Sequence, residues 1–201
     1  MPELEQNQSE PKAFTVPVGI SNRHIHLTKE DLEQLFGKGY ELTKVKDLTQ
    51  PGEYAANEKV IIVGPKGAME GVRVLGPLRK RTQIEISLTD SYKLGVKPPV
   101  RDSGDLEGSP GITIVGPKGS VILQEGVIVA ARHIHLHTSE AEELGVENGQ
   151  RVRVEVEGDR SVVFNNVLLR VSPKYAKEIH FDTDEANGAM LKNGDLVKVL
   201  L

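Results

Sequence analysis

The pentapeptide Arg-His-Ile-His-Leu occurs twice in the chain, at residues 23–27 and at residues 132–136. On a β-strand, the side chains of residues i and i+2 point to the same face. The two histidines of each copy therefore project together, and the isoleucine between them points into apolar packing. Four of the six histidines lie in these copies. The repeat predicts two β-strands that each aim a pair of imidazoles at one metal ion.

Short runs rich in Val, Ile and Leu follow one another from Phe14 onward, and Gly and Pro turns separate them. This spacing is typical of barrels or sandwiches rather than of alternating strands and helices. We expect strands at residues 13–20, 59–63, 71–75, 82–87, 111–115, 121–131, 151–156, 161–171 and 196–200. Capping-type starts at Thr28 and Ser139 predict two short helices, and a third is expected over residues 184–191.

Two further repeats indicate a duplicated architecture. Val-Gly-Pro-Lys-Gly occurs at residues 63–67 and 115–119, and a helix end followed by a Gly turn and a strand occurs near residues 144–154 and 191–199. We therefore predict a mainly β fold of two small β-barrels with short capping helices and an active-site cleft between them. Residues 14–22 with 131–201 would form one barrel and residues 23–130 the other, after a disordered lead-in at residues 1–13.

Charge and composition exclude several classes of protein and of metal site. Lysine and arginine number 25 against 29 acidic residues, which gives a net charge of −4 and argues against nucleic-acid binding. The chain has no cysteine, so any metal must take histidine and carboxylate ligands. No apolar run approaches membrane-spanning length, and residues 1–12 lack the basic start and apolar stretch of a secretory signal. We expect a cytoplasmic protein that does not bind membranes and forms a homo-oligomer, a dimer in the simplest case.

The histidine pairs, His24 with His26 and His133 with His135, are the predicted metal ligands. A single His-x-His on an exposed strand face would carry little weight, but the same pentapeptide twice favours a metal site. His180 lies in another strand-like run and is the natural third ligand for one of the two pairs.

Glu85 is the expected third ligand for the pair His24–His26, because a chain without cysteine must supply a carboxylate. In residues 82–86 it shares a strand face with Gln83, opposite Ile84 and Ile86. Two histidines and a carboxylate with an open position form the ligand pattern of a catalytic zinc site. His137 extends the second histidine face by one step, but it falls where the first repeat has a helix cap, so we interpret it as a capping or solvent residue.

Basic residues gather just before Glu85. We interpret Lys80 and Arg81 as a charged turn and Arg79 as the candidate for an anion site, because a guanidinium grips phosphate through two parallel hydrogen bonds. The Gly-rich loop at residues 102–111 could present backbone N–H groups to phosphate. No Gly-Lys-Ser/Thr follows it, so it is not a P-loop.

Five segments in order, residues 19–27, 75–85, 101–104, 131–136 and 180–188, resemble the PduL-type phosphotransacylases, which are phosphate propanoyltransferases. The resemblance implies two β-barrels, two zinc ions in the cleft between them, and exchange of an acyl group between coenzyme A and inorganic phosphate. One zinc ion would be held by His24, His26 and Glu85, and the other by His133, His135 and His180. Phosphate would bind Arg79. Coenzyme A would lie along Ile20, Ser21 and Asn22 and contact Lys66, Arg73 and Asn187.

The expected reaction converts acyl-CoA (propanoyl or acetyl) and phosphate to acyl phosphate and CoA by direct transfer. The metal would polarise the thioester carbonyl or stabilise the thiolate, and Arg79 would hold phosphate in line. Two other classes remain open: a dinuclear metal-dependent hydrolase, in which the same histidines activate water, and a non-catalytic metal-binding barrel. Phosphate-dependent release of free thiol from acyl-CoA separates the three.

Residues 1–12 are predicted to be dispensable. Family members packed in bacterial microcompartments often carry an amphipathic N-terminal helix, but this segment has no repeating apolar stripe, and Pro11 blocks helix continuation. Its deletion should leave zinc content, folding and transacylase rate unchanged. Recruitment of a fluorescent protein into microcompartment shells by these twelve residues would contradict this and favour the alternative location, the microcompartment lumen.

Overall fold

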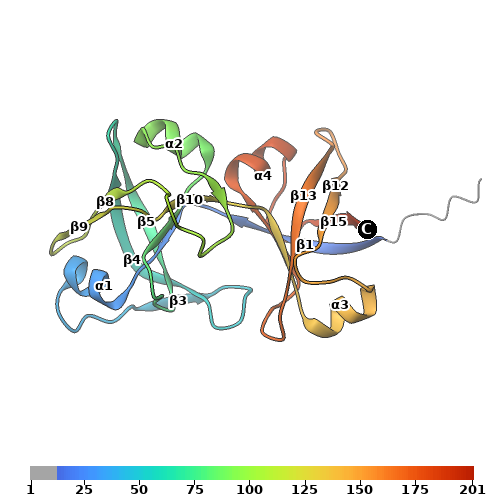
Figure 1. Ribbon diagram of the computed structural model, residues 1–201, viewed down its shortest axis with the longest axis horizontal. Coiled ribbons are helices and arrows are strands. Elements are labelled where there is room, and N and C mark those ends of the chain that lie inside the picture. Colours follow the sequence, from blue (N-terminus) through green and yellow to red (C-terminus); the bar gives the residue numbers. More distant parts are fainter. Residues whose placement is uncertain (1–12) are drawn as a thin grey trace, which may run out of the picture.

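The structure is a computed structural model that describes residues 13–201, so the predicted lead-in lies almost entirely outside the described residues. These residues form fifteen strands and four short helices, which confirms the mainly β prediction (Figure 1). The helices are α1 (Lys29–Phe36), α2 (Leu88–Leu94), α3 (Thr138–Leu144) and α4 (Thr183–Ala189). The strands are β1 (Ala13–Ser21), β2 (His24–His26), β3 (Lys44–Asp47), β4 (Tyr54–Val63), β5 (Ala68–Gly76), β6 (Gln83–Glu85), β7 (Val100–Arg101), β8 (Ile112–Val115), β9 (Ser120–Leu123), β10 (Val127–Ala130), β11 (His133–Leu136), β12 (Arg151–Val156), β13 (Val162–Val171), β14 (Glu178–Asp182) and β15 (Leu196–Leu200).

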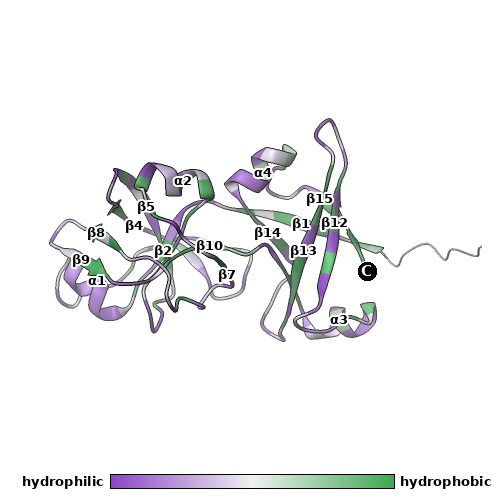
Figure 2. Ribbon diagram, turned by 45° about the horizontal axis from the view of Figure 1, so that its top comes forward, coloured by the Kyte–Doolittle hydropathy of each residue, from purple (hydrophilic) through white to green (hydrophobic). Residues whose placement is uncertain are grey.

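Six strands close into a barrel in the order β1-β14-β11-β13-β12-β15. β1 brings the start of the described chain into this barrel by pairing in parallel with β14 and antiparallel with β15. The interior is filled by buried apolar side chains such as Val154, Leu169, Ile179 and Phe181. Hydrophobic residues recur along these strands, whereas the tip of the β12–β13 hairpin is hydrophilic (Figure 2).

The other nine strands form a sheet that curls into a half-barrel, with the order β7-β10-β6-β2-β5-β4-β8-β9 and β3 paired with β4. The half-barrel has its own apolar core, in which Ile25, Ile62 and Ile114 are fully buried. The two units lie side by side, and α2 and α4 stand next to each other on one face (Figure 1). None of the helices formed by residues 13–201 has the length and apolar composition needed to cross a membrane.

Each copy of the pentapeptide repeat forms a central strand of one unit. β2 lies between β5 and β6 in the half-barrel, and β11 lies between β13 and β14 in the barrel. Ile25 and Ile134, the isoleucines between the histidine pairs, are fully buried in the two cores. The period-2 alternation read from the sequence is therefore confirmed, and it leaves the histidines on the opposite face of each strand.

Helix starts follow local capping chemistry. Thr28 caps α1 by accepting a hydrogen bond from the Asp31 N–H. The start expected at Ser139 is wrong, because α3 begins at Thr138 and its N-cap is His137, which confirms the capping interpretation of that histidine. Helix α2 was not predicted, because the apolar run at residues 82–87 is typical of a strand that continues to Ser87. Ser87 is instead the N-cap of that helix and forms a capping box with Asp90. The strand expected over residues 121–131 is also interrupted, since Gly126 adopts a φ of 139° between β9 and β10.

The Val-Gly-Pro-Lys-Gly repeat has a structural explanation. The two copies form the β4–β5 and β8–β9 turns, and each packs against the C-terminal end of a helix. The Lys66 N–H donates to the Leu94 carbonyl of α2 at 3.1 Å, and the Lys118 N–H donates to the Leu35 carbonyl of α1 at 3.0 Å. Each turn thus satisfies a helix carbonyl that has no partner within its own helix.

This packing predicts that Gly64→Ala destabilises the fold. A Cβ at Gly64 would lie 2.2 Å from the Leu94 carbonyl oxygen, so the backbone must move. We expect a loss of about 1–3 kcal/mol in the free energy of unfolding, measured by urea denaturation. The matched control is Gly188→Ala in α4, where a Cβ meets nothing within 4 Å and alanine favours the helix. Equal stabilities of the two variants would contradict the close approach.

Candidate metal and phosphate site

The first predicted set of donors, His24, His26 and Glu85, comes together on two adjacent strands. β2 and β6 are antiparallel, and His24 lies opposite Glu85 in the register. One donor atom from each of the three residues lies within 4.8 Å of the others. His24 Nε2 is 3.5 Å from Glu85 Oε2, and all three residues are buried.

The second set, His133, His135 and His180, repeats this arrangement in the barrel. β11 and β14 are antiparallel, and His133 lies opposite His180. The three donor atoms again lie within 4.8 Å of one another, and the Nε2 atoms of His133 and His135 are 3.1 Å apart. Nε2 of His180 also lies 2.7 Å from a carboxylate oxygen of Glu178. In both units, the first histidine of the pair faces the third donor across the strand ladder.

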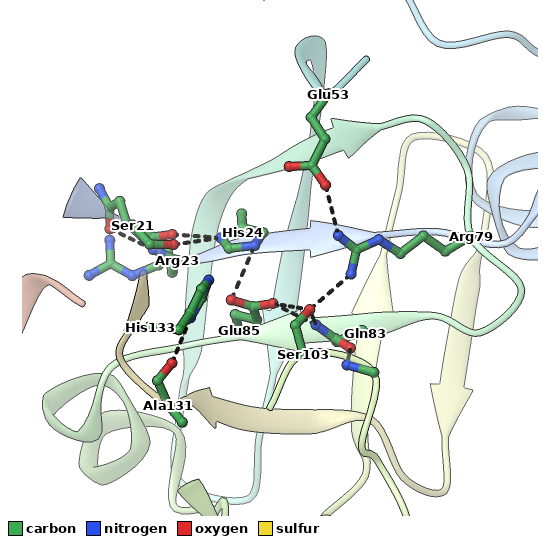
Figure 3. A network of polar contacts seen from close by, with 12 residues as sticks. Ser21, Arg23, His24, Glu53, Arg79, Gln83, Glu85, Ser103, Ala131 and His133 are labelled. Atoms are coloured by element: carbon green, nitrogen blue, oxygen red, sulfur yellow. Dashed lines mark hydrogen bonds and ion pairs between the residues drawn. The ribbon is translucent and has the colours of Figure 1, made fainter. Parts of the chain in front are cut away.

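Backbone carbonyls orient the first histidine of each pair. His24 Nδ1 is 2.8 Å from the Asn22 carbonyl oxygen, and His133 Nδ1 is 2.8 Å from the Ala131 carbonyl oxygen (Figure 3). A carbonyl can only accept, so each Nδ1 carries the proton and the lone pair of the neutral ring lies on Nε2. This second contact is the usual way in which a protein fixes the tautomer of a metal-binding histidine.

The protonation states suit metal ligands. Burial, together with the charge of His180, lowers the pKa of His133 to about 4, and burial and the charge of His133 lower the pKa of His135 to about 2. Burial also lowers the pKa of His26 well below its ordinary range. These rings are therefore neutral at pH 7, the form that binds metal.

His24 and Glu85 act as a coupled pair. Burial opposes charge on both, but their mutual attraction outweighs burial, so the pKa of His24 is raised and the pKa of Glu85 is lowered. Glu85 is thus an ionised carboxylate that favours a positive charge beside it. A divalent cation would supply that charge in place of the proton on His24.

The two sets of donors fit zinc. Bonds of about 2.0–2.1 Å in tetrahedral geometry place neighbouring ligand atoms about 3.3 Å apart. In the structure, the separation is 3.1 Å between Nε2 of His133 and Nε2 of His135 and 3.5 Å between His24 Nε2 and Glu85 Oε2, and these two values bracket that spacing. In addition, the buried Nδ1 atoms of His26 and His135 have no hydrogen-bond partner among the described residues. Hydrogen bonding among the described residues therefore does not account for these two nitrogen atoms.

A single side chain, that of Ser103, lies between the Arg79 guanidinium and Glu85 of the first set of donors (Figure 3). Its guanidinium donates to Ser103 Oγ at 3.0 Å and to Glu53 at 3.4 Å, and the Ser103 hydroxyl donates to Glu85 Oε1 at 3.0 Å. Gln83 donates to both Ser103 and Glu85. The predicted anion-binding residue and the predicted metal ligand thus belong to one polar network.

Sequence reasoning assigned no role to three residues that this geometry brings into the site. Ser103 lies in the Gly-rich loop that was a candidate for phosphate binding, and Gln83 shares a strand face with the predicted metal ligand Glu85. The position of each next to a candidate residue was therefore a signal in the sequence. Glu178, beside His180, gave a similar signal because it lies two residues earlier on the same strand face.

One depression reaches both sets of donors. Its wall includes Glu85 from the half-barrel and His133 and His180 from the barrel, together with residues of the connections between the two units. Ser21 and Asn22, two of the residues expected to contact coenzyme A, also line it. The depression therefore lies where the sequence predicted a cleft.

The other predicted coenzyme A contacts lie outside this wall. Ile20 is the neighbouring residue of β1, and Arg73 pairs with His24 in the strand register while its guanidinium donates to the Ala56 carbonyl. Lys66 lies in the β4–β5 turn under α2, and Asn187 lies on α4. The structure thus brings Ser21 and Asn22 to the two donor sets, but not Lys66 or Asn187.

The environment of the Glu185 carboxyl group, on α4, leads us to expect that its contribution to the free energy of unfolding depends on pH. Burial and the negative charge of Asp182 raise its pKa from 4.5 to about 7, although Arg132 opposes the shift. Between these two values the folded state binds more protons than the unfolded state, so stability falls as pH rises and levels off above about 7. We expect Glu185→Gln to gain stability over the unmodified protein across this interval, by up to roughly 3 kcal/mol.

The measurement is urea denaturation of metal-free protein at pH 5 and pH 8. The exposed Glu143 of α3 offers a matched control, Glu143→Gln. A gain for Glu185→Gln that is the same at both pH values would contradict the prediction.

Comparison with known proteins adds independent findings. The model of a family described as phosphate propanoyltransferase matches residues 17–192. A phosphate propanoyltransferase of Thermotoga maritima is 63% identical over 184 residues, which cover 91% of this chain and 88% of that protein. A relative of the same description from Rhodopseudomonas palustris is 53% identical over 186 residues, covering 92% and 82%. One from Listeria monocytogenes is 50% identical over 179 residues, covering 89% and 84%.

Proposed function

The chain belongs to the phosphate propanoyltransferase family and is an acyltransferase, and from that premise we propose that it transfers a short acyl group between coenzyme A and inorganic phosphate at a site holding two zinc ions. The acyl group is propanoyl or acetyl. The observation that carries the proposal is the pair of three-donor sets that share one depression, with the Arg79 guanidinium linked to one of them through Ser103.

The chain's own residues favour phosphate as the nucleophile. Arg79 is a fixed cation with a side chain that is 31% exposed, so it can offer a fork of N–H groups to a phosphate without leaving its network. A phosphate oxygen would attack the thioester carbonyl carbon, the C–O bond would form, and the C–S bond would break to release the thiolate. Holding phosphate in place removes part of the entropic barrier and offsets the negative charge of the transition state.

The donor sets define what metal would contribute. His24, His26 and Glu85 would hold one zinc ion, and His133, His135 and His180 the other. What zinc supplies when bound at such ligands is Lewis acidity toward the thioester carbonyl or the departing thiolate. Direct transfer needs no acyl-enzyme, which agrees with the absence of cysteine from the sequence.

The test is release of free thiol from propanoyl-CoA and acetyl-CoA, with and without inorganic phosphate. We expect thiol release to require phosphate, and trapping with hydroxylamine should detect the acyl phosphate. Thiol release without phosphate would favour a metal-dependent hydrolase, and no release from either substrate would favour a non-catalytic metal-binding protein. The ratio of the two substrates' kcat/KM values would identify the preferred acyl group.

A further inference from the structure

The arginine that opens the first pentapeptide repeat is tied to a helix. Arg23 donates from Nε to Asp90 Oδ2 at 2.8 Å and from Nη2 to Oδ1 at 2.7 Å, a two-pronged contact with a carboxylate whose side chain is 5% exposed. Asp90 is the third residue of α2 and closes a capping box with Ser87. Since Ser87 follows Glu85 by two residues, this ion pair links β2 to the segment that directly continues from the third donor.

The second repeat has the same contact in the other unit. Arg132 Nη1 lies 2.9 Å from Glu185 Oε1, and Glu185 is the third residue of α4, where it closes a capping box with Asp182. Asp182 follows His180 by two residues. In both units, therefore, an arginine one residue before the first histidine pairs with a carboxylate five residues after the third donor. The capping residues differ in type, so the sequence does not display this correspondence as a repeat.

Each ion pair completes a closed path of backbone and side-chain contacts that includes its donor set. His24 lies opposite Glu85 in the strand ladder, and the chain runs from Glu85 through Ser87 into α2, from which Asp90 returns to Arg23. β2 and β6 have only three residues each, so few ladder hydrogen bonds hold their register. A slip of one residue would turn the donors to the opposite face. The arginine contact resists that slip from outside the ladder.

The arginine also lies within the segment that orients the first histidine. The carbonyls that accept from His24 Nδ1 and His133 Nδ1 belong to Asn22 and Ala131, the residues directly before Arg23 and Arg132. Fixing the arginine side chain therefore restricts the backbone on which the tautomer of the next residue depends.

We propose that Arg23 and Arg132 are positioning residues, each of which holds the third donor, Glu85 or His180, within ligand distance of its histidine pair and keeps Nε2 of the first histidine directed at the cluster. They act on the donor sets through Asp90 and Glu185. The inference rests on the proposed function in taking the two donor sets as metal ligands.

The main test is zinc affinity of Arg23→Lys, measured by competition with a chromophoric chelator. Lysine keeps the charge but cannot form the two-pronged contact. We expect the affinity for one of the two zinc ions to fall by about 10- to 100-fold, the usual effect of losing an outer partner of a metal ligand, with the other ion unaffected. Asp90→Asn should weaken the same ion, and the double variant should be no weaker than either single variant, because both remove one contact.

Arg81→Lys is the matched control, since Arg81 makes an exposed ion pair with Glu125, and neither residue belongs to a donor set. It should leave both zinc affinities unchanged. Should Arg23→Lys fail to fold, Arg132→Lys provides the same test in the barrel, where the ion pair is partly exposed. There the ion held by His133, His135 and His180 should be the one weakened.

A second readout needs no metal. Long-range proton–nitrogen NMR spectra of metal-free protein, at a pH where the rings are neutral, report which nitrogen of each histidine carries the proton. We expect Nδ1–H at His24 and His133, and loss of that preference at His24 alone in Arg23→Lys. Unchanged zinc affinities and tautomers in a folded variant would overturn the positioning role while leaving the acyltransferase proposal intact. An unmodified protein that binds no zinc would instead refute the metal part of the proposed function, and the tautomers would still decide whether Arg23 orients His24.

Discussion

Replacing His133 with alanine is expected to lower the acyl-transfer rate by a factor of about one hundred or more and to reduce the zinc content from about two ions per chain to about one. His133 is buried, lies opposite His180, and has its Nε2 atom 3.1 Å from that of His135. Its loss leaves two donors, one fewer than the three protein ligands of a catalytic zinc site and two fewer than the four of a structural site. The donors of the half-barrel are on other strands, so the first ion should remain.

The control is His137→Ser, which removes a histidine two residues beyond His135. His137 is the N-cap of α3 and belongs to neither donor set, and serine preserves the cap. Zinc content and transfer rate should stay unchanged in this variant. Zinc content can be measured by elemental analysis of protein purified without chelators. A His133→Ala protein that keeps both ions would refute the second donor set.

The histidine pairs could be predicted because they depend only on local geometry. Residues i and i+2 share a strand face in any sheet, and the buried Ile25 and Ile134 confirm that alternation. The third donors could not be predicted from local strand geometry alone. Glu85 and His180 meet the pairs across antiparallel ladders, 61 and 47 residues away in the chain from the histidines they face. The sequence pattern alone left open which pair His180 joins, and only the family resemblance assigned it.

The roles of Asp90 and Ser103 could not be predicted because they depend on contacts between distant segments. Asp90 lies 67 residues from Arg23, and its role becomes visible only once α2 is known to start at Ser87. That start was missed because an apolar run suggested that the preceding strand continued, while the Ser87–Asp90 capping box was the competing signal. Ser103 likewise reaches Glu85 from a loop whose path the sequence does not determine.

Arg79→Ala is expected to raise the KM for phosphate or lower kcat by a factor of about one hundred or more, with both metal ions retained. The guanidinium is held between Glu53 and Ser103, and Ser103 links it to Glu85, so it is fixed beside the first donor set rather than mobile in solvent. A fixed cation at this place stabilises a bound dianion and the charge that develops in the transition state. Arg79→Lys should recover only part of the activity, because an ammonium group cannot reproduce the planar fork.

The neighbouring variant Lys80→Ala serves as the control, since it removes an adjacent positive charge that is exposed and makes none of the hydrogen bonds that link Arg79, Ser103 and Glu85. Initial rates measured over a range of phosphate concentrations should show the raised KM or lowered kcat in Arg79→Ala and unchanged values in Lys80→Ala. Loss of zinc from Arg79→Ala would mean that Arg79 supports Glu85 through Ser103 instead of binding phosphate. Unchanged phosphate kinetics with both ions in place would remove Arg79 from the site. A selective phosphate defect with both ions retained is the result that only a phosphate-binding role for this guanidinium explains.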